Sequence, residues 1–190
     1  MKRIFTYILV LFIFISSTAN AAKTTYLLDS THSYVLWMID HFGFSKQSGK
    51  FFADGSLVLD EQKPENSSVS AVIQIASIDT GIDELNQHLQ GGLFFDAGNY
   101  PLATFVSKKV VQNGKNTAKV LGTLTIRGVS KPAVLDVKFN KVGNNLITNK
   151  TTAGFTGTVK IQRSDFGIIT LLPGLGDDID LIIQVEAYKP

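Results

Sequence analysis

The sequence contains no cysteine, and this absence removes several classes of function at once. Disulfides, thiolate nucleophiles and cysteine-ligated metals are excluded, so an exported domain of this composition must rely on its apolar core for stability. Histidine is scarce as well, because the chain has only His32, His41 and His88, whose spacings match no local metal-binding motif. We therefore predict no metal site and expect His41 to lie in the protein interior.

Long hydrophobic runs are also lacking, apart from one at the N-terminus. Residues 4–15 form an apolar run that follows Lys2 and Arg3 and precedes a small-residue segment ending at Ala21. This arrangement predicts a secretory signal peptide over residues 1–21, cleaved after Ala21, and a single domain over residues 22–190. The run is shorter than the roughly 20 apolar residues that a transmembrane helix needs.

The sequence has no excess of charge of either sign once the leader is removed. Loss of Lys2 and Arg3 reduces Lys plus Arg from 18 to 16, which equals the 16 Asp plus Glu. A neutral chain provides no basic field that would attract nucleic acid or an anionic lipid surface. We therefore expect no nucleic-acid partner.

Alternation of apolar and polar residues dominates the rest of the chain and predicts half-buried β-strands. In residues 133–140, Leu135 and Val137 face one way while Asp136 and Lys138 face the other. Five further runs each place an apolar set on one face: Val35, Trp37, Ile39 and His41; Val69, Ala71, Ile73 and Ile75; Val120, Gly122, Leu124 and Ile126; Ala153, Phe155, Gly157, Val159 and Ile161; Ile179, Leu181, Ile183, Val185 and Ala187.

Turn signals separate these runs at Asp54-Gly55, Asn113-Gly114, Gly143-Asn144-Asn145 and Pro173-Gly174. The pattern gives about eight strands, or nine if residues 26–29 are counted. So many alternating strands in one domain predict an all-β, antiparallel sandwich or closed barrel, and closure has the advantage that it leaves no exposed edges.

Residues 77–101 interrupt this rhythm. Ile82, Leu85 and Leu89 recur at helical spacing and predict one short amphipathic helix over residues 81–90. Gly91-Gly92 is expected to end it, because glycine tolerates the left-handed conformation common at helix C-termini. A helix between strands of an all-β domain is expected to cover one end of that domain.

The same segment contains Asp79-Thr80-Gly81, the tripeptide of aspartic proteases. That chemistry needs two carboxylates about 3 Å apart, and the tripeptide occurs here once. The structural interpretation is that Asp79 or Thr80 caps the helix, with Asp83 near its third position. An acid-dependent hydrolase centred on Asp79 remains an alternative. Farther along, Arg163-Ser164-Asp165 is expected to form a charged turn at a strand end.

Phenylalanine is abundant, with 13 residues in a chain of 190, and strands already rich in aliphatic residues accompany it. A well-filled core would explain this excess. An eight-stranded barrel would also explain it, because its interior can hold one slender ligand. Small inward residues such as Ala71, Gly122, Ala153 and Gly157 would leave room for one. Composition leaves both explanations open.

Several segments together resemble the YceI family of exported, lipocalin-like proteins across essentially the whole mature chain. The segments are Asp29-x-x-His32-Ser33-x-Val35-x-Trp37-x-Ile39-x-His41; Ser77-Ile78-Asp79-Thr80-Gly81; His88-Leu89 with Phe94-Phe95-Asp96 and Tyr100-Pro101; residues 122–132; and Arg163-Ser164-Asp165-Phe166-Gly167. Five segments in this order are far more specific than any one of them.

The resemblance implies an extended, antiparallel, eight-stranded β-barrel that holds a polyisoprenoid or the tail of a quinone, with no catalytic residues and no cofactor besides that lipid. The expected role is a periplasmic carrier or scavenger, monomeric or homodimeric. The expected cavity-lining residues are Val35, Trp37, Ile39, His41, Ile73, Ile75, Leu85, Leu89, Phe94, Phe95, Phe105, Leu124, Ile126, Leu135, Val137, Phe155, Val159, Phe166, Leu181 and Ile183. Phe94 and Phe95 are placed near the mouth, and His41 and His32 are candidates for hydrogen bonds to a headgroup.

The chain departs from the family pattern at the helix end. Trp37 stands where Phe is usual, Leu85 and Asn86 occupy the place of an arginine ahead of His88, and Leu93 replaces a polar residue before Phe94. These departures make that end more apolar and weigh against a salt bridge to an anionic headgroup. A lipid donor or acceptor is a possible partner of the carrier. A further alternative is a ligand-free barrel that acts through a protein partner such as a membrane b-type cytochrome.

Overall fold

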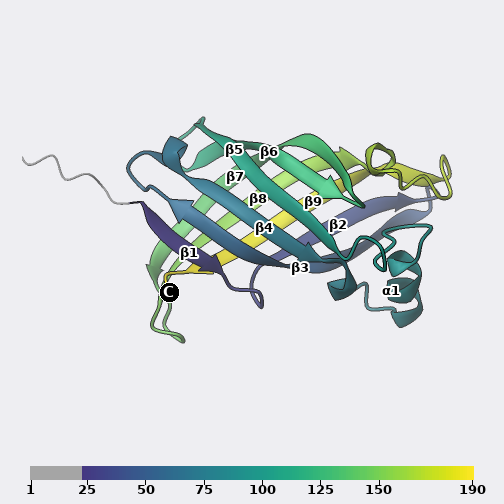
Figure 1. Ribbon diagram of the computed structural model, residues 1–190, viewed down its shortest axis with the longest axis horizontal. Coiled ribbons are helices and arrows are strands. Elements are labelled where there is room, and N and C mark those ends of the chain that lie inside the picture. The colour runs from purple at the N-terminus through teal and green to yellow at the C-terminus, as the bar shows by residue number, and fades with distance from the viewer. Residues whose placement is uncertain (1–22) are drawn as a thin grey trace, which may run out of the picture.

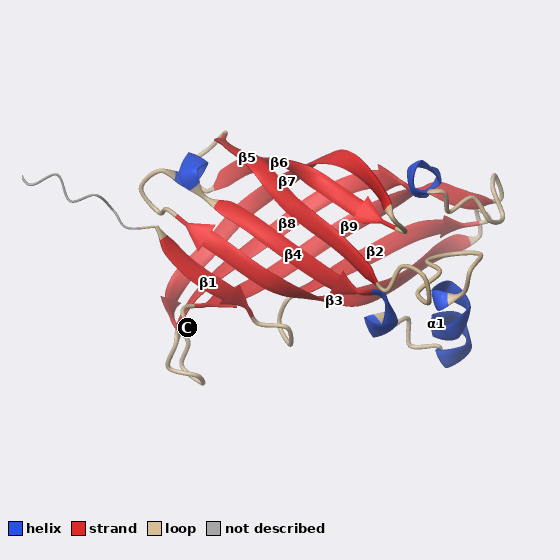
Figure 2. Cartoon of the chain, viewed as in Figure 1, coloured by secondary structure: helices blue, strands red, loops and turns tan. Residues whose placement is uncertain are grey.

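The computed structural model describes residues 23–190, so the predicted signal peptide, residues 1–21, lies outside the described residues. The described chain is a β-barrel with one α-helix at one end (Figures 1 and 2). Its strands are β1 (Thr24–Leu28), β2 (Tyr34–His41), β3 (Ser45–Leu59), β4 (Ser68–Gln74), β5 (Leu102–Gln112), β6 (Thr117–Ile126), β7 (Val129–Asn144), β8 (Thr151–Gln162) and β9 (Leu175–Tyr188). Among residues 23–190, no helix has the length and apolar character needed to span a bilayer.

Eight strands close the barrel in the order β3-β2-β9-β8-β7-β6-β5-β4, and pairing of β4 with β3 completes the circle. All neighbouring strands are antiparallel. The prediction of an eight-stranded antiparallel barrel is therefore confirmed. Closure matters energetically because no strand of the circle is left with an unpaired edge.

The short run near residue 26 is a ninth strand, β1. It occupies the same position in the strand order as β2. Both strands lie between β3 and β9. Strand β2 pairs with their parts near the helical end of the barrel, through Tyr34↔Phe52 and Tyr34↔Gln184. Strand β1 continues the same position toward the other end, through Thr24↔Leu59 and Leu28↔Ala187. The wall is consequently interrupted at residues 29–33, where the chain leaves it.

Ser33 repairs this interruption. Its side chain is completely buried. The hydroxyl donates to the carbonyl oxygen of Glu186 at 2.9 Å and accepts from the Glu186 amide at 3.2 Å. The Ser33 carbonyl oxygen also accepts from the Ala53 amide at 2.9 Å. One residue therefore satisfies backbone groups of both flanking strands where no ladder can form.

We expect Ser33→Ala to lower the free energy of unfolding by about 1–3 kcal/mol, because both backbone groups of Glu186 lose a buried partner. Urea denaturation followed by circular dichroism measures the change. Ser30→Ala, in the same loop but exposed, serves as the matched control and should leave the unfolding midpoint unchanged. Equal stability of the Ser33→Ala variant and the control would contradict the bridging role.

The outer side of the interruption is held by a local cluster around Asp29. His32 Nδ1 lies 2.9 Å from Asp29 Oδ2, and the Thr31 amide and hydroxyl both donate to Asp29 Oδ1. Partial burial acts to raise the pKa of Asp29, but the bonds from Thr31 and His32 outweigh it and lower the pKa to about 2. The hydrogen bond to Asp29 and its charge raise the pKa of His32. The cluster fixes the loop that leaves the wall.

This cluster makes stability depend on pH. The His32 contribution is complete below the unfolded-state pKa of about 6.5 and is lost as pH rises through the higher folded-state value. The Asp29 contribution is complete above about 4 and is lost as pH falls toward its folded-state pKa. We therefore expect the stability difference between the wild type and His32→Gln to be larger at about pH 5.5 than at about pH 8.5. Urea titrations at both values measure it, and an equal difference would contradict the ion pair.

The predicted helix is confirmed as α1 (Asp83–Gln90), although the predicted cap is wrong. The N-cap position is occupied by Ile82, and its side chain makes no capping hydrogen bond. Instead, the amide and hydroxyl of Thr80 both donate to Asn86 Oδ1, at 2.9 and 2.8 Å. A side chain inside the helix thus reaches back to the preceding turn, and the predicted capping by Asp79 or Thr80 with Asp83 at the third position does not form.

Two further expectations about this helix need correction. Ile82 is about half exposed, at 48 %, so only Leu85 and Leu89 of the predicted apolar stripe turn inward. Gly91 does end the helix, but with φ −71° and ψ 167° it is extended rather than left-handed. The helix lies over one end of the barrel, as predicted for an insertion between strands (Figure 1).

Candidate functional site

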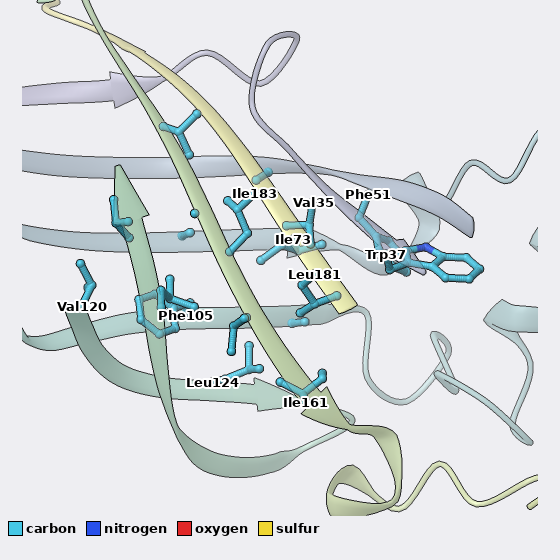
Figure 3. Close-up of a pocket in the computed structure, with 18 of the residues that line it drawn as sticks. Val35, Trp37, Phe51, Ile73, Phe105, Val120, Leu124, Ile161, Leu181 and Ile183 are labelled. Atoms are coloured by element: carbon cyan, nitrogen blue, oxygen red, sulfur yellow. The ribbon is translucent and has the colours of Figure 1, made fainter. Parts of the chain in front are cut away.

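A cavity of about 640 Å³ runs along the inside of the barrel. This volume lies within the range typical of small-molecule sites, about 300–1,000 Å³. All 20 residues that the sequence predicts as lining border this cavity. Figure 3 shows the reason, because side chains such as Val35, Leu124 and Ile183 point from different strands toward one shared space. Residues two apart on a strand face the same side, so alternation identifies the lining residues of the strands. The others lie on α1 or in connections between strands, namely Ile75, Leu85, Leu89, Phe94, Phe95 and Phe166.

Strand β3 contributes several lining residues that sequence reasoning missed, namely Phe51, Ala53, Leu57 and Leu59. The reason is that Asp54-Gly55 was interpreted as a turn. In the structure β3 continues through it, with Gly55 at φ +135°, and a Cβ there would overlap the carbonyl oxygen of Ser70 on β4. Close approach of β4, rather than a turn, requires this glycine. The alternation of residues 51, 53, 57 and 59 was the available signal.

Small inward residues play different parts. Gly157 and Ala71 border the cavity as expected. Gly122 does not leave room for a ligand, because the Phe105 ring fills the space that its side chain would occupy. Ala153 is fully buried in a separate cluster near β1, together with Tyr26. The free volume is thus concentrated along the middle of the barrel.

The two ends of the cavity differ in polarity. At the end formed by the β3–β4 and β5–β6 connections, the lining is polar and comprises Asp60, Glu61, Gln62, Ser67, Ser68, Gln112, Lys115, Asn116 and Thr117. At the α1 end it is mostly apolar and comprises Phe42, Leu85, Leu89, Phe94, Phe95, Ile168, Leu171 and Leu175, with His41, Gln47 and His88 among them. A lipid in this cavity would therefore meet different surroundings at its two ends.

Phe94 and Phe95 both lie at the α1 end, where the sequence places them. Phe94 is buried, and its ring centroid lies 5.0 Å from that of His88 on α1. Phe95 meets the ring of Phe51 edge to face at 5.2 Å. These contacts attach the helical segment to the wall of the cavity. His41 borders the cavity but is exposed, so the expectation that it lies in the interior is wrong. His32 lies exposed on the outer surface and does not border the cavity, so the suggestion that it contacts a headgroup is wrong.

A buried guanidinium fixes the β8–β9 loop at this end. Arg163, expected in a charged turn, begins the 3-10 helix η3 (Arg163–Phe166) and is only 5 % exposed. Its side chain donates to four backbone carbonyl oxygens, of Ile168 (2.9 Å), Thr170 (2.9 Å), Leu175 (3.1 Å) and Gly176 (2.7 Å). Burial lowers the pKa of Arg163, while the charge of nearby Asp177 acts in the opposite direction. The loop that carries cavity residues 168 and 171 is therefore held by the Arg163 side chain through the loop's own carbonyl oxygens.

The same loop is tied to the segment that follows α1. The Thr170 hydroxyl donates to the carbonyl oxygen of Leu93 at 2.6 Å. Arg127, at the β6–β7 turn, donates to the carbonyl oxygens of Gly92 and Gly167, both at 2.9 Å. These bonds join three connections that are far apart in the sequence into one frame around the cavity end.

Trp37 is an inward residue with an unusual environment. Its indole packs against Gly49 on β3, where a Cβ would come within 2.7 Å of Trp37 Cζ2 and 2.9 Å of the Asp79 carbonyl oxygen. Trp37 Nε1 is buried and has no hydrogen-bond partner among residues 23–190. A buried N–H without a partner lowers stability, so the indole stabilises this site through its packing and not through a hydrogen bond.

Asp79 pairs with strand β3 of the wall and does not face the cavity. Its backbone amide and carbonyl both bond to Lys50 at 2.9 Å, which forms a single β-bridge to β3. Asp79 Oδ2 lies 3.4 Å from Lys50 Nζ, and Oδ1 accepts from the Gly81 amide. Asp79 does not border the cavity. A carboxylate paired with a lysine lacks the second carboxylate that shares a proton in aspartic proteases.

Comparison with known proteins places this geometry in a family. Residues 26–187 match the sequence profile described as the YceI-like domain. The chain belongs to the YceI-like family. A UPF0312 protein of Serratia proteamaculans is 36% identical over 176 residues, covering 91% of each chain. A UPF0312 protein of Vibrio parahaemolyticus is 32% identical over 173 residues, covering 90% of each.

Several solved structures share the fold. BcnA of Burkholderia cenocepacia superposes with a TM-score of 0.74 at 27% identity, covering 84% of this chain and 98% of that one. The YceI protein of Campylobacter jejuni gives 0.62 at 30% identity, covering 100% and 99%. A polyisoprenoid-binding domain from Saccharophagus degradans gives 0.67 at 17% identity, covering 87% and 98%, and at that identity shows the fold alone.

The Trp37 indole N–H, which has no hydrogen-bond partner in the described part of the chain, should contribute little to stability. We expect Trp37→Phe to change the free energy of unfolding by less than about 1 kcal/mol, because removal of an unsatisfied donor offsets the lost contacts. Trp37→Ala should cost about 3–5 kcal/mol, since nothing then fills the space. Guanidinium titrations of both variants measure this. A cost for Trp37→Phe equal to that of Trp37→Ala would show that the N–H has a stabilising partner.

Proposed function

We propose that this protein binds a long-chain isoprenoid lipid of the polyprenyl or quinone type inside the barrel and carries or sequesters it in the periplasm. The observation that carries the proposal is the long apolar cavity. Its charged lining residues, such as Asp60 and Lys115, belong to one end, and Arg163 at the other end is engaged with carbonyl oxygens. The walls between the ends are aliphatic and aromatic.

The driving force is burial of the lipid tail. Each methylene removed from water contributes about 0.8 kcal/mol, from which the cost of ordering a flexible chain must be subtracted. A prenyl chain is slender and branched, which suits an elongated barrel interior lined by branched aliphatic side chains. The name of the Saccharophagus degradans neighbour, a polyisoprenoid-binding domain, is consistent with this use of the fold.

A binding role requires no catalytic group, and this agrees with the surroundings of the candidate acid. The hydrolase alternative centred on Asp79 finds little support, because Asp79 is paired with Lys50 and lies outside the cavity. A ligand-free barrel acting through a membrane protein would not need a cavity of about 640 Å³, so the carrier is the better explanation of the free volume.

The direct test is to purify the protein from its native host, extract it with organic solvent and identify the extract by mass spectrometry. We expect an isoprenoid lipid in stoichiometric amount. Absence of lipid from the extract, together with no binding of an added long-chain quinone, would rule out the carrier role.

A matched pair of variants locates the lipid. Gly157 faces the cavity, and a Cβ there makes only ordinary contacts, the nearest at 3.5 Å to Ile183. Gly157→Phe should therefore fill the cavity without disturbing the wall and reduce retained lipid at least about tenfold. Thr158→Phe places the same ring on the exposed outer face of β8 and should retain lipid like the wild type. Equal retention by both variants would mean that the lipid binds outside the barrel.

A further inference from the structure

Five large apolar side chains are exposed around the α1 end of the cavity. They are Phe42 and Phe44 in the β2–β3 turn, Leu93 after α1, and Ile169 and Leu171 in the β8–β9 loop; we call them the apolar rim. Phe44 is 91 % exposed, and Leu93 and Ile169 are 63 % and 64 % exposed. Exposure of this degree for large apolar residues gathered at one end of a barrel is unusual unless something covers them.

The loops that carry the apolar rim contact one another, through one hydrogen bond and one packing contact. The carbonyl oxygen of Leu93 accepts from Thr170, which lies between the two rim residues of the β8–β9 loop. The ring of Phe42 lies against Gly174, so the β2–β3 turn contacts the far side of the same loop. Figure 1 shows these connections together at the end of the barrel that carries α1.

The apolar rim is continuous with the cavity wall. Phe42 and Leu171 belong to both, since they are about half exposed and also border the cavity. The opposite cavity end is bordered by polar and charged residues instead. An apolar path thus leads from the barrel interior to the protein surface at the α1 end.

The charges beside the rim do not favour an anionic surface. Asp40 accepts from the Gly43 amide, and Asp83 and Glu84 occupy the first turn of α1. The basic residues at this end are engaged: Lys46 is paired with Asp180 at 3.6 Å, Lys131 with Asp165 at 3.5 Å, and Arg127 donates to the carbonyl oxygens of Gly92 and Gly167. A contact through this end would therefore depend on apolar insertion and not on attraction between basic residues and lipid phosphates.

We propose that the apolar rim docks on a phospholipid bilayer, so that the lipid moves between the membrane and the cavity without crossing water. This inference rests on the proposed carrier function. Phe44 and Ile169 enter the interfacial region first, because they are the most exposed members on two different loops. The cavity then opens toward the hydrocarbon through Phe42 and Leu171.

Flotation of the purified protein with phosphatidylcholine vesicles tests the proposal. The double variant Phe44→Ser, Ile169→Ser should lower the partition coefficient at least about tenfold, and added salt should change wild-type binding little. The control is Leu146→Ser, Ile147→Ser on the β7–β8 hairpin, which lies at the other end of the barrel (Figure 1). These two residues are 90 % and 92 % exposed, against 91 % and 64 % for Phe44 and Ile169, so the control removes apolar residues that are at least as exposed and should bind like the wild type.

Three results would overturn the proposal. The first is absence of vesicle binding by the wild type, and the second is equal loss in both double variants. The third is a dimer in size-exclusion chromatography that only Phe44→Ser, Ile169→Ser dissociates, which would assign the rim to a second copy of the chain. Lipid extraction gives an independent result, so a protein that contains lipid but does not bind vesicles would refute the docking and leave the carrier function intact.

Discussion

Closure of the backbone hydrogen-bond network is the constraint on which the rest of this structure depends. Because β4 pairs with β3, the backbone N–H and C=O groups of the wall bond to each other and need no hydrogen-bond partner from the interior. The inside can then be almost wholly apolar and still keep free volume. Ser33 contributes to this arrangement, because it bonds Glu186 and Ala53 at the gap between the two strands that share one position in the wall, where the Asp29 amide also bonds Glu186.

The second level of organisation is the frame at the α1 end. Here the chain uses side-chain to backbone bonds in place of ladders, from Arg127, Arg163 and Thr170 to loops that are distant in sequence. The helix itself has few bonds to the barrel and is attached mainly by rings, through Phe94 and Phe95. The cavity is thus enclosed by the closed sheet along its length and by hydrogen-bonded loops at one end.

Alternation at period two was sufficient for the inward faces of most strands, because residues two apart on a strand face the same side. It left a sandwich and a closed barrel open, and the resemblance to the YceI family indicated the barrel. The sequence was insufficient wherever a contact joins distant segments. Gly55 resembles a turn residue until β4 is seen against it, and Arg163 resembles a surface charge until the β8–β9 loop wraps around it. Thr80 shows the same limit at short range, since it was expected to cap the helix until its bond to Asn86 is seen.

Arg163 has a consequence for how this end of the protein can vary. The Arg163 guanidinium donates to four carbonyl oxygens of residues 168–176, out of the five N–H donors that an arginine has. These bonds fix the backbone of the loop and do not depend on which side chains the loop carries. Shape and surface chemistry are therefore separable here. The exposed side chain at position 169 can be replaced without loss of any bond from Arg163, so the surface that this loop presents can change while its course stays the same.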